Sequence, residues 1–420
     1  MNQSITPRTA FAGGIATLAL SAAASAQFTR IEGFSGLGEG ISNTGVVAGS
    51  FGTPEYFMWT ELDGPMLIGG TVPGNGVGGQ GKVSADGTRI CGSFLNPASG
   101  LNEMAWYDVA TGTWTPLGGI GGSVDAEISG GWGISNDGQK VVGLAWTAAG
   151  GPGSARAVIA DISTAMVTDL GSTVVERSTR ANGVDDDGDV VVGWQDGAGR
   201  QGAVWVDGVQ ELIFMDSGDA AFEAFGVSGD GQWVTGIGFG SPFGVGNAYR
   251  YNTVTDAYEQ LPNLTVGGES RMAGTAVSPD GSMIVGGTWG LGPATFGKAI
   301  VWREGIGTVL LSEYLDELGI AYPSEYVFNF VSDMSADGTR LVGWGSLGGF
   351  AANETFVIEL PSGTPCVADL DNSGSVDFGD LTSILSAWGP CSGCPADLDG
   401  NGDVGFTDLT AVLSGWGPCP

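Results

Sequence analysis

Two twelve-residue segments near the C-terminal end of the chain repeat one spacing of oxygen-bearing side chains. The first is DLDNSGSVDFGD, Asp369–Asp380, and the second is DLDGNGDVGFTD, Asp397–Asp408. Oxygen ligands recur at every second position and a glycine stands at the sixth, as a loop that wraps one calcium ion requires. We therefore expect two bound calcium ions. The expected ligands, with the backbone carbonyl serving at position seven, are Asp369, Asp371, Ser373, Ser375, Asp377 and Asp380 in the first loop and Asp397, Asp399, Asn401, Asp403 and Asp408 in the second.

The two predicted ligand sets differ in charge. Both loops close with aspartate instead of the glutamate that usually reaches the ion with both oxygens. This difference predicts modest affinity, in the roughly 10⁻⁴ to 10⁻³ M range of extracellular calcium loops. Position nine is Asp377 in the first loop and Gly405 in the second, which leaves four side-chain carboxylates against three. The first loop should therefore bind calcium more tightly.

Each loop leads into one predicted helix. Apolar residues follow at the i, i+3, i+4 and i+7 spacing of an amphipathic helix. They are Leu381, Ile384, Leu385 and Trp388 after the first loop and Leu409, Val412, Leu413 and Trp416 after the second. We expect the two stripes to pack on each other as the core of a small module, and a groove for a partner is the alternative. Position eight is apolar in both loops, Val376 and Val404, which predicts a short β contact between the loops.

The body of the chain is a repeat. Seven copies of one phrase, such as VSADGTRICG and VSPDGSMIVG, place Asp-Gly or a related pair between two apolar segments. Such a pair predicts a hairpin turn because glycine accepts a positive φ and the aspartate carboxylate accepts local N–H groups. The turn glycines recur about every 50 residues, the period of propeller blades. They are Gly45, Gly87, Gly138, Gly188, Gly231, Gly281 and Gly338.

Two further strands after each hairpin complete a four-stranded blade. The predicted third strands carry Trp59, Trp106, Ile159, Trp205, Tyr251, Trp302 and Ile358. The seventh unit has no fourth strand of its own, and QFTRIEG, residues 27–33, precedes the first hairpin where such a strand would lie. We therefore predict an all-β, seven-bladed β-propeller over residues 27–360 that the N-terminal strand closes. An insertion at Ser312–Tyr326 should add a helical turn between the sixth and seventh blades.

Composition and charge exclude several functions. The chain has 420 residues, 46 acidic against 14 basic side chains, and a formal net charge of −32. Such a surface repels phosphate, so nucleic acid is not an expected partner. Histidine is absent, which removes His-based acid–base and nucleophilic catalysis and the commonest zinc sites. Chemistry that depends on a pair of carboxylates remains possible.

The N-terminal segment predicts a signal peptide over residues 1–26. A single positive charge, Arg8, precedes an apolar stretch, and Ala24-Ser25-Ala26 supplies small residues before a cleavage between Ala26 and Gln27. No later apolar segment is long enough to predict a membrane span. We expect a secreted protein, extracellular or attached to a bacterial cell surface.

The cysteines are distributed unevenly. Four lie in the last 55 residues, and these candidates for two disulfides are Cys366, Cys391, Cys394 and Cys419. The fifth, Cys91, lies in an apolar segment and should be a buried small hydrophobic side chain. The predicted organisation is thus a signal peptide, a propeller, a linker at 361–365 and a cysteine-bracketed module at 366–420.

Two resemblances to known families follow from these motifs. Residues 28–360 resemble HAF repeats, an extracellular repeat family, which implies a propeller without established catalytic residues. The two loop-helix units, bracketed by CVAD or CPAD and WGPC, resemble a dockerin type I domain of the Gly-Cys-bounded kind. That resemblance implies calcium-dependent folding, docking onto a cohesin domain, and an association with extracellular polysaccharide degradation. Antiparallel packing of the two units would favour the pairs Cys366–Cys419 and Cys391–Cys394 over the other pairings.

One departure from the dockerin pattern concerns the partner. Loop positions ten and eleven, usually Ser/Thr-like where a dockerin binds a cohesin, are Phe378-Gly379 and Phe406-Thr407. The receptor is therefore either a cohesin-like domain or another surface protein.

The sequence leaves three functions open. The first is a non-enzymatic calcium-binding protein whose propeller binds a polysaccharide or a protein, with Trp132, Trp289 and Trp344 as aromatic candidates for stacking or for packing between blades. The second is a carboxylate-dependent glycoside hydrolase or polysaccharide lyase. The third is a spacer without a small ligand. In DDDGD, Asp185–Asp189, the densest acidic cluster of the repeat region, the repeat itself predicts a hairpin turn.

Overall fold

A computed structural model describes most of the chain from Gln27 onward. The described residues are 27–50, 52–72, 79–148, 154–174, 177–239, 246–264, 271–289, 297–348, 352–361, 368–371, 375–391, 394–399 and 401–418. They form two compact units, one within Ala26–Pro361 and one within Ser362–Pro420.

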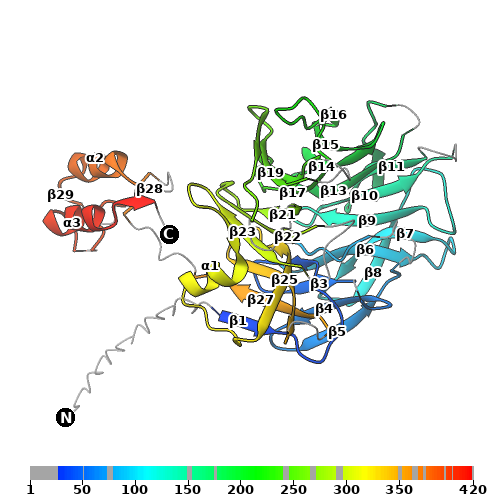
Figure 1. The fold of residues 1–420 in the computed structure, drawn as a ribbon, viewed down its shortest axis with the longest axis horizontal. Coiled ribbons are helices and arrows are strands. Elements are labelled where there is room, and N and C mark those ends of the chain that lie inside the picture. Colours follow the sequence, from blue (N-terminus) through cyan, green and yellow to red (C-terminus); the bar gives the residue numbers. More distant parts are fainter. Residues whose placement is uncertain are drawn as a thin grey trace, which may run out of the picture. The chain divides into compact units, whose positions relative to one another are not determined.

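The larger unit is a seven-bladed β-propeller (Figure 1). Every blade is an antiparallel sheet, and in the first six the strands follow one another in chain order. The first blade contains β2 (Gly40–Ile41), β3 (Val47–Gly49), β4 (Tyr56–Thr60) and β5 (Gly64–Gly69). The second contains β6 (Arg89–Leu95), β7 (Asn102–Asp108) and β8 (Thr113–Gly118). The third contains β9 (Ser129–Ile134), β10 (Lys140–Trp146), β11 (Ala155–Asp161) and β12 (Met166–Asp169). The next three contain β13 (Thr179–Val184), β14 (Val190–Asp196), β15 (Arg200–Val206) and β16 (Val209–Leu212); β17 (Glu223–Val227), β18 (Trp233–Ile237), β19 (Ala248–Asn252) and β20 (Ala257–Gln260); and β21 (Met272–Val277), β22 (Met283–Thr288), β23 (Ala299–Arg303) and β24 (Gly307–Leu310). In the second blade, an isolated bridge between Val83 and Ile90 takes the inner position.

The seventh blade is closed by the N-terminal strand, as predicted. It contains β25 (Tyr326–Met334), β26 (Arg340–Leu347) and β27 (Glu354–Glu359), and β1 (Gln27–Arg30) pairs antiparallel with β27. The ring of Phe28 lies 5.0 Å from that of Tyr326 and 5.5 Å from that of Phe328. Residues more than 290 positions apart therefore share one sheet, which removes an exposed edge.

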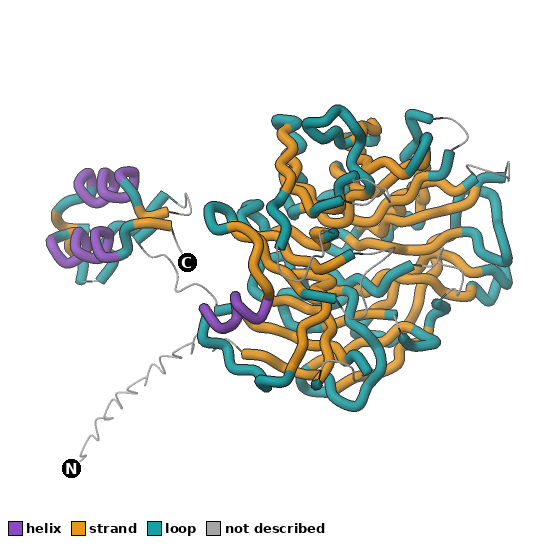
Figure 2. Tube along the Cα trace, viewed as in Figure 1, coloured by secondary structure: helices purple, strands orange, loops and turns teal. Residues whose placement is uncertain are grey.

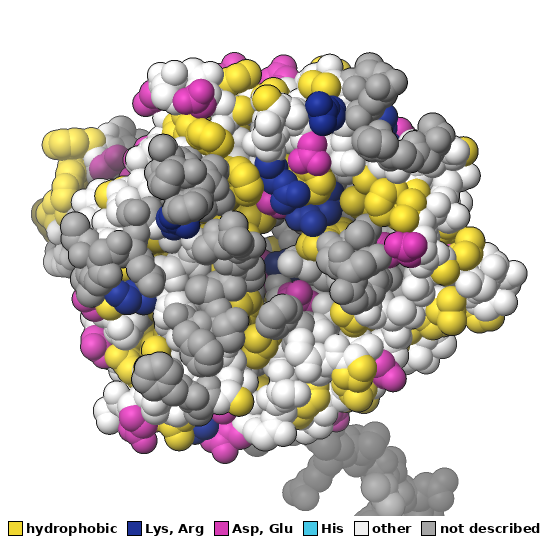
Figure 3. All heavy atoms as spheres, turned by 45° about the vertical axis from the view of Figure 1, so that its right-hand side comes forward, with side chains coloured by type: hydrophobic (Ala, Val, Ile, Leu, Met, Phe, Trp, Pro, Cys, Tyr) yellow, Lys and Arg dark blue, Asp and Glu magenta, His cyan; other side chains and the backbone are white. Residues whose placement is uncertain are grey.

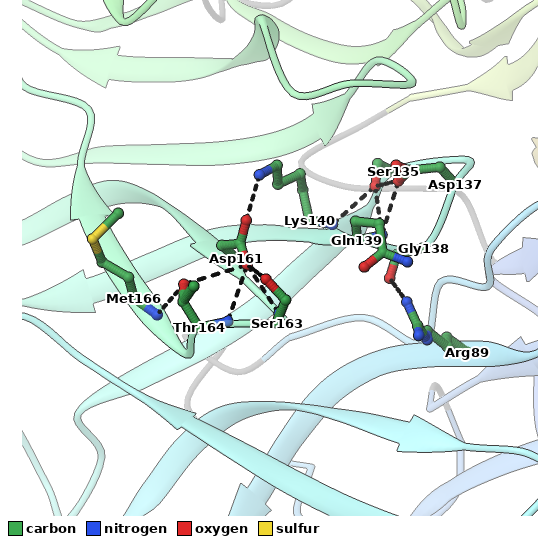
Figure 4. A network of polar contacts seen from close by, with 10 residues as sticks. All are labelled: Arg89, Ser135, Asp137, Gly138, Gln139, Lys140, Asp161, Ser163, Thr164 and Met166. Carbon is green, nitrogen blue, oxygen red and sulfur yellow. Dashed lines mark hydrogen bonds and ion pairs between the residues drawn. The ribbon is translucent and has the colours of Figure 1, made fainter.

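The predicted hairpins are confirmed. All seven turn glycines have a positive φ, between 72° and 91°. In the third blade, the Ser135 hydroxyl donates to the Asp137 carboxylate, which also accepts the Gln139 N–H at 2.8 Å (Figure 4). The same serine-to-aspartate hydrogen bond recurs in four other hairpins: Ser84 to Asp86, Ser228 to Asp230, Ser278 to Asp280 and Ser335 to Asp337.

Ion pairs join the strands and the blades around these hairpins. Lys140 pairs with Asp161 across β10 and β11 at 2.6 Å. Arg89 of the second blade donates to the carbonyl of Gly138 in the third (Figure 4). The hairpin of the third blade is thereby fixed to its own sheet and to the second blade.

The hydrophobic core lies between neighbouring sheets. Most residues of the third strands are buried, and Trp205 in the fourth blade has no exposed surface. Cys91 is also fully buried, as predicted. The predicted helical turn after the sixth blade is α1 (Leu311–Glu317), which buries Leu311 and Leu315 against the seventh blade.

The smaller unit contains two helices, α2 (Phe378–Ser386) and α3 (Phe406–Ser414), shown in purple in Figure 2. Its core is built symmetrically from the two loop-helix repeats, with Val376, Ile384, Val404 and Val412 all fully buried. The predicted packing of the two stripes is confirmed for Ile384 and Val412.

The outer half of each predicted stripe is exposed instead of buried. Leu385 is 55% exposed and Trp388 44%, and Leu413 and Trp416 have nearly the same values. A nine-residue helix in a module this small presents one narrow face to the core, because only one other helix covers it.

The predicted β contact between the two loops is wrong. β28 (Ser375–Val376) pairs with β31 (Gly417–Pro418), and β29 (Gly389–Pro390) pairs with β30 (Asp403–Val404). Each loop therefore pairs with the segment that follows the helix of the other loop-helix repeat. Two short pairs of antiparallel strands thus join the two repeats.

Candidate metal sites

The closing aspartate of the first loop is held by three backbone N–H groups. Asp380 lies in the first turn of α2 and is fully buried. One carboxylate oxygen accepts from Leu370 at 2.6 Å and from Asp371 at 3.3 Å, and the other accepts from Asp377 at 2.8 Å. The helix thus fixes this carboxylate against the start of its own loop.

The second loop repeats this arrangement. Asp408, also fully buried in the first turn of α3, accepts from Leu398 at 2.8 Å, Asp399 at 3.1 Å and Gly405 at 2.8 Å. Two segments that differ at five of their twelve positions thus build the same closing geometry.

These backbone donors keep both closing carboxylates ionised. Burial by itself would raise the pKa of Asp380, but the three N–H donors outweigh it and leave that pKa below its ordinary value. The hydrogen bond from Gly405 is the largest cause that lowers the pKa of Asp408, and it too outweighs desolvation. Both side chains therefore carry the negative charge that a cation site needs.

Each loop gathers three carboxylates. Asp369, Asp371 and Asp380 each offer an oxygen within 4.8 Å of the other two, and Asp397, Asp399 and Asp408 do the same. Three like charges this close repel one another strongly unless a cation lies between them. Both triads could therefore hold a metal ion.

One oxygen in the second loop fits this interpretation closely. The Oδ2 atom of Asp397 accepts the Gly402 N–H at 2.8 Å, whereas its Oδ1 atom is buried and has no hydrogen-bond partner. A buried neutral polar group without a hydrogen-bond partner costs about 1–3 kcal/mol, and a charged carboxylate oxygen costs more. A cation at the triad would supply the missing interaction. Gly402 has φ +90°, which places the sharp turn at the predicted position six.

The other predicted ligands have varied surroundings. Asp377 caps α2, because its carboxylate accepts the Gly379 N–H at 2.7 Å. Asn401 accepts from the Asp403 N–H at 2.9 Å and donates to Asp399 at 2.8 Å. Asp403 has an exposed side chain, and Ser373 and the side chain of Ser375 lie outside the described residues. The structure therefore brings together six of the eleven predicted ligands, the three aspartates at positions one, three and twelve of each loop.

One of the two predicted disulfides is described. Cys391 and Cys394 are joined, with their Cα atoms 5.8 Å apart, and both pack against the core of the smaller unit. Cys366 and Cys419, the other predicted pair, lie outside the described residues. Among the helices that the structure describes, none combines the length and the apolar character needed to cross a membrane.

The three aromatic candidates on the propeller take part in packing. Trp344 is 5% exposed and stacks on Phe330 at 4.8 Å. Trp289 lies 4.8 Å from Phe225, and Trp132 lies against the Arg180 guanidinium at 3.7 Å. Stacking of a sugar on an exposed Trp344 is therefore excluded.

Sequence reasoning missed the cluster that Trp132 forms with Arg180, Trp194, Arg200 and Phe222, which come from three blades. The repeat phrase includes none of these residues.

No protein-family model and no curated protein matches the sequence. Solved structures do match. An oligogalacturonate lyase in complex with manganese is similar with a TM-score of 0.50 and 14% identity over 80% of this chain and 94% of that chain. An oligogalacturonate lyase from Vibrio parahaemolyticus gives 0.48 and 14% over 80% and 92%. TolB from Acinetobacter baumannii gives a TM-score of 0.40 and 14% identity over 75% of this chain. The match covers 63% of the length of TolB. At this identity the likeness supports the propeller fold alone.

Proposed function

We propose that the protein is a secreted, non-enzymatic calcium-binding protein in which the propeller is a binding scaffold and the smaller unit an attachment module. The observation that carries this proposal is the pair of acidic triads, each closed by a buried aspartate that three backbone N–H groups orient. The module resembles a dockerin, so its partner is a cohesin-like domain or another receptor on an extracellular assembly or surface. A role beside polysaccharide degradation follows from the same resemblance.

Calcium is the ion that these ligands favour. The triads offer hard oxygen ligands without histidine or cysteine, which disfavours zinc and copper. Magnesium demands a tight octahedral shell and retains several waters, whereas calcium accepts the six to eight oxygens that a flexible twelve-residue loop provides. Filling both sites would cancel the repulsion within each triad and couple metal binding to the stability of the module.

The surface available for attachment lies at the two ends of the module. Phe378 is 73% exposed and its ring lies 5.1 Å from that of Trp416. Phe406 is 79% exposed and its ring lies 5.2 Å from that of Trp388. Each pair joins position ten of one loop to the tryptophan two residues after the other helix. Calcium in the loops would therefore fix the positions of the exposed aromatic rings.

Calorimetric titration of the chain from Gln27 to Pro420 with calcium tests the proposal. We expect two binding events, of which the weaker is lost in Asp397→Asn. Asp403→Asn in the same loop removes the same charge from an exposed side chain that is expected to serve only through its backbone carbonyl, so it should keep both events. Magnesium at the same concentration should bind more weakly. The absence of binding at millimolar calcium would contradict the proposal.

A further inference from the structure

Five side chains from three propeller blades alternate between aromatic ring and guanidinium. The Arg180 guanidinium lies 3.7 Å from the ring centroid of Trp132 and 5.3 Å from that of Trp194. The Arg200 guanidinium lies 4.0 Å from the ring of Trp194 and 5.8 Å from that of Phe222. We call these five residues the arginine ladder. Cation–π contacts of this kind fix the planes of the guanidinium groups.

The two guanidinium groups of the ladder share one buried carboxylate. Glu223 is 3% exposed, and it accepts from Arg180 at 2.8 Å and from Arg200 at 3.0 Å. The amide of Asn182 donates to the same carboxylate at 3.0 Å and accepts from Arg180 at 2.8 Å. The only other acidic group in an ion pair with the two arginines in the described part of the chain is Asp196, 3.9 Å from Arg200 and 43% exposed.

The ladder lies beside the central channel, at the end away from the hairpins. Arg200 and Glu223 are the first residues of β15 and β17, and Arg180 is the second of β13, whereas the hairpin turns follow the other end of the inner strands. Asn182, which is hydrogen-bonded to the ladder, lines a cavity of about 100 Å³ that extends to the hairpin residues Ala85 and Ser228, and no ladder residue lines this cavity. Figure 3 shows a face of the molecule on which Lys and Arg side chains gather beside a hollow near its centre.

Arg200 retains hydrogen-bonding capacity that its surroundings do not use. Its Nη1 atom donates to Glu223, but within the described residues its Nη2 atom makes no hydrogen bond, and Asp196 is too far from Nε for one. The side chain is 32% exposed. A planar guanidinium with free N–H groups on its open side binds carboxylates with two parallel hydrogen bonds.

Arg250 shows what a purely structural arginine looks like in the same fold. It lies between two indole rings as well, 4.7 Å from Trp233 and 4.8 Å from Trp302. All three of its nitrogens donate, to Glu259, to Glu304 and to the carbonyl of Gly281, and the side chain is only 11% exposed. Arg200 has the same kind of aromatic support without this saturation.

We propose that Arg200 binds a carboxylate of an acidic glycan, a polymer of sugar acids, at this end of the channel, with Glu223 and Trp194 as positioning residues. The inference rests on the proposed role of the propeller as a binding scaffold and names its ligand class. The half-exposed rings of Trp132 and Phe222 flank the site and offer apolar surface to a sugar ring. An acidic peptide supplies the carboxylate but not the flat pyranose face that such rings accommodate.

The charge balance of the ladder supports an anionic ligand. Burial lowers the pKa of Arg180 to about 10, and the neighbouring positive charge of Arg200 acts in the same direction. A bound carboxylate would offset both effects. The overall negative charge of the protein opposes an anion at long range, but at physiological salt this repulsion is screened beyond about 8 Å.

The test is calorimetric titration of the chain from Gln27 to Pro420 with a hexamer of galacturonic acid at about 0.15 M salt, in the presence of a calcium chelator. The chelator excludes binding through calcium bridges. We expect saturable binding to the free acid, and at least tenfold weaker binding to its methyl ester, which keeps the sugar and removes the charge. Arg200→Gln should weaken binding of the acid at least tenfold.

Two further variants sharpen the test. Asp196→Asn removes the carboxylate that competes for Arg200, so it should strengthen binding several-fold. Arg250→Gln is the matched control and should leave the affinity unchanged. The inference is overturned if Arg200→Gln binds as the wild type does, if the ester binds as well as the acid, or if only an oligoglutamate peptide binds. Calcium titration of the same variants without the chelator reports on the attachment module separately. A failure of glycan binding is therefore distinguishable from a failure of the proposed function.

Discussion

The hairpin of the fourth blade contains an aspartate where the other six contain a serine. In five of those six, the serine hydroxyl donates to the aspartate two residues later, as Ser135 does to Asp137. Asp185 occupies this position with 3% of its surface exposed, and it accepts the Gly188 N–H at 2.9 Å. Asp187 stands where the acceptor aspartate stands in those hairpins, so this hairpin has two carboxylates where the others have a serine and a carboxylate. Burial first, and then the charges of Asp187 and Asp189, raise the pKa of Asp185 to about 6.

This raised pKa makes a signed prediction for Asp185→Ser. Because the pKa is about 6 in the folded protein and 3.8 in the reference state, the folded protein binds a proton more tightly than the unfolded chain between these values. The contribution of Asp185 to wild-type stability should therefore fall as the pH rises from 4 to 7, by up to about 3 kcal/mol at 1.36 kcal/mol per pKa unit. The serine variant lacks this loss and gains a hydrogen bond to Asp187. Its free energy of unfolding relative to the wild type should thus increase by about 2–3 kcal/mol from pH 4 to pH 7.

Urea denaturation of both proteins at pH 4, 5, 6 and 7 measures this difference. Groups common to both proteins cancel in the comparison. Glu61→Gln, which removes one negative charge from an exposed side chain, controls for net charge and should show a difference below about 0.5 kcal/mol at every pH. A difference between Asp185→Ser and the wild type that stays flat from pH 4 to 7, or that shrinks, would refute the reasoning.

Three further predictions concern the closure and the module. Phe28→Ala removes a half-buried ring from the contact between β1 and the seventh blade and should lower the free energy of unfolding, measured with heat or urea, by about 2–4 kcal/mol. The control Leu62→Ala, at a side chain that is 91% exposed, should lower it by less than about 0.5 kcal/mol. Equal effects of the two variants would argue against closure by β1. Asp377→Ala removes the N-cap of α2 and should destabilise the smaller unit by about 1 kcal/mol. Gly405→Asp supplies the missing cap and ligand to the second loop and should stabilise that unit. Circular dichroism measures both melting temperatures with and without calcium, and a shift of both in the same direction would contradict this expectation. Asp397→Asn should leave the tighter calcium event intact, and loss of that event would show that the second loop, not the first, is the stronger site.

The propeller was predictable because its signals are local. An Asp-Gly pair needs only its own glycine at positive φ and its own carboxylate to form a hairpin, and the repetition of the pair counts the blades. The closure by residues 27–33 was predictable too, since a missing fourth strand and an unassigned N-terminal strand leave one way to complete the seventh sheet. The spacing of the calcium-type loops is equally local, and it correctly placed Asp369, Asp371 and Asp380 together.

The contacts between elements were decided by tertiary structure alone. Position eight of each loop does lie in a short β contact, as predicted, but whether Val376 pairs with the other loop or with Gly417 depends on how the two helices pack. The exposure of Leu385 and Trp388 depends on how little of each helix the other one covers. The arginine ladder joins Arg180, Trp194 and Arg200 of one sheet to Trp132 and Phe222 of the two neighbouring blades, and these come together only because the three blades meet there. Sequence determines which residues turn, pair and repeat, because hydrogen bonds within a hairpin or a loop are set by neighbours in the chain. Which side chains from different blades come into contact is set by the packing of whole sheets, and only the folded structure shows it.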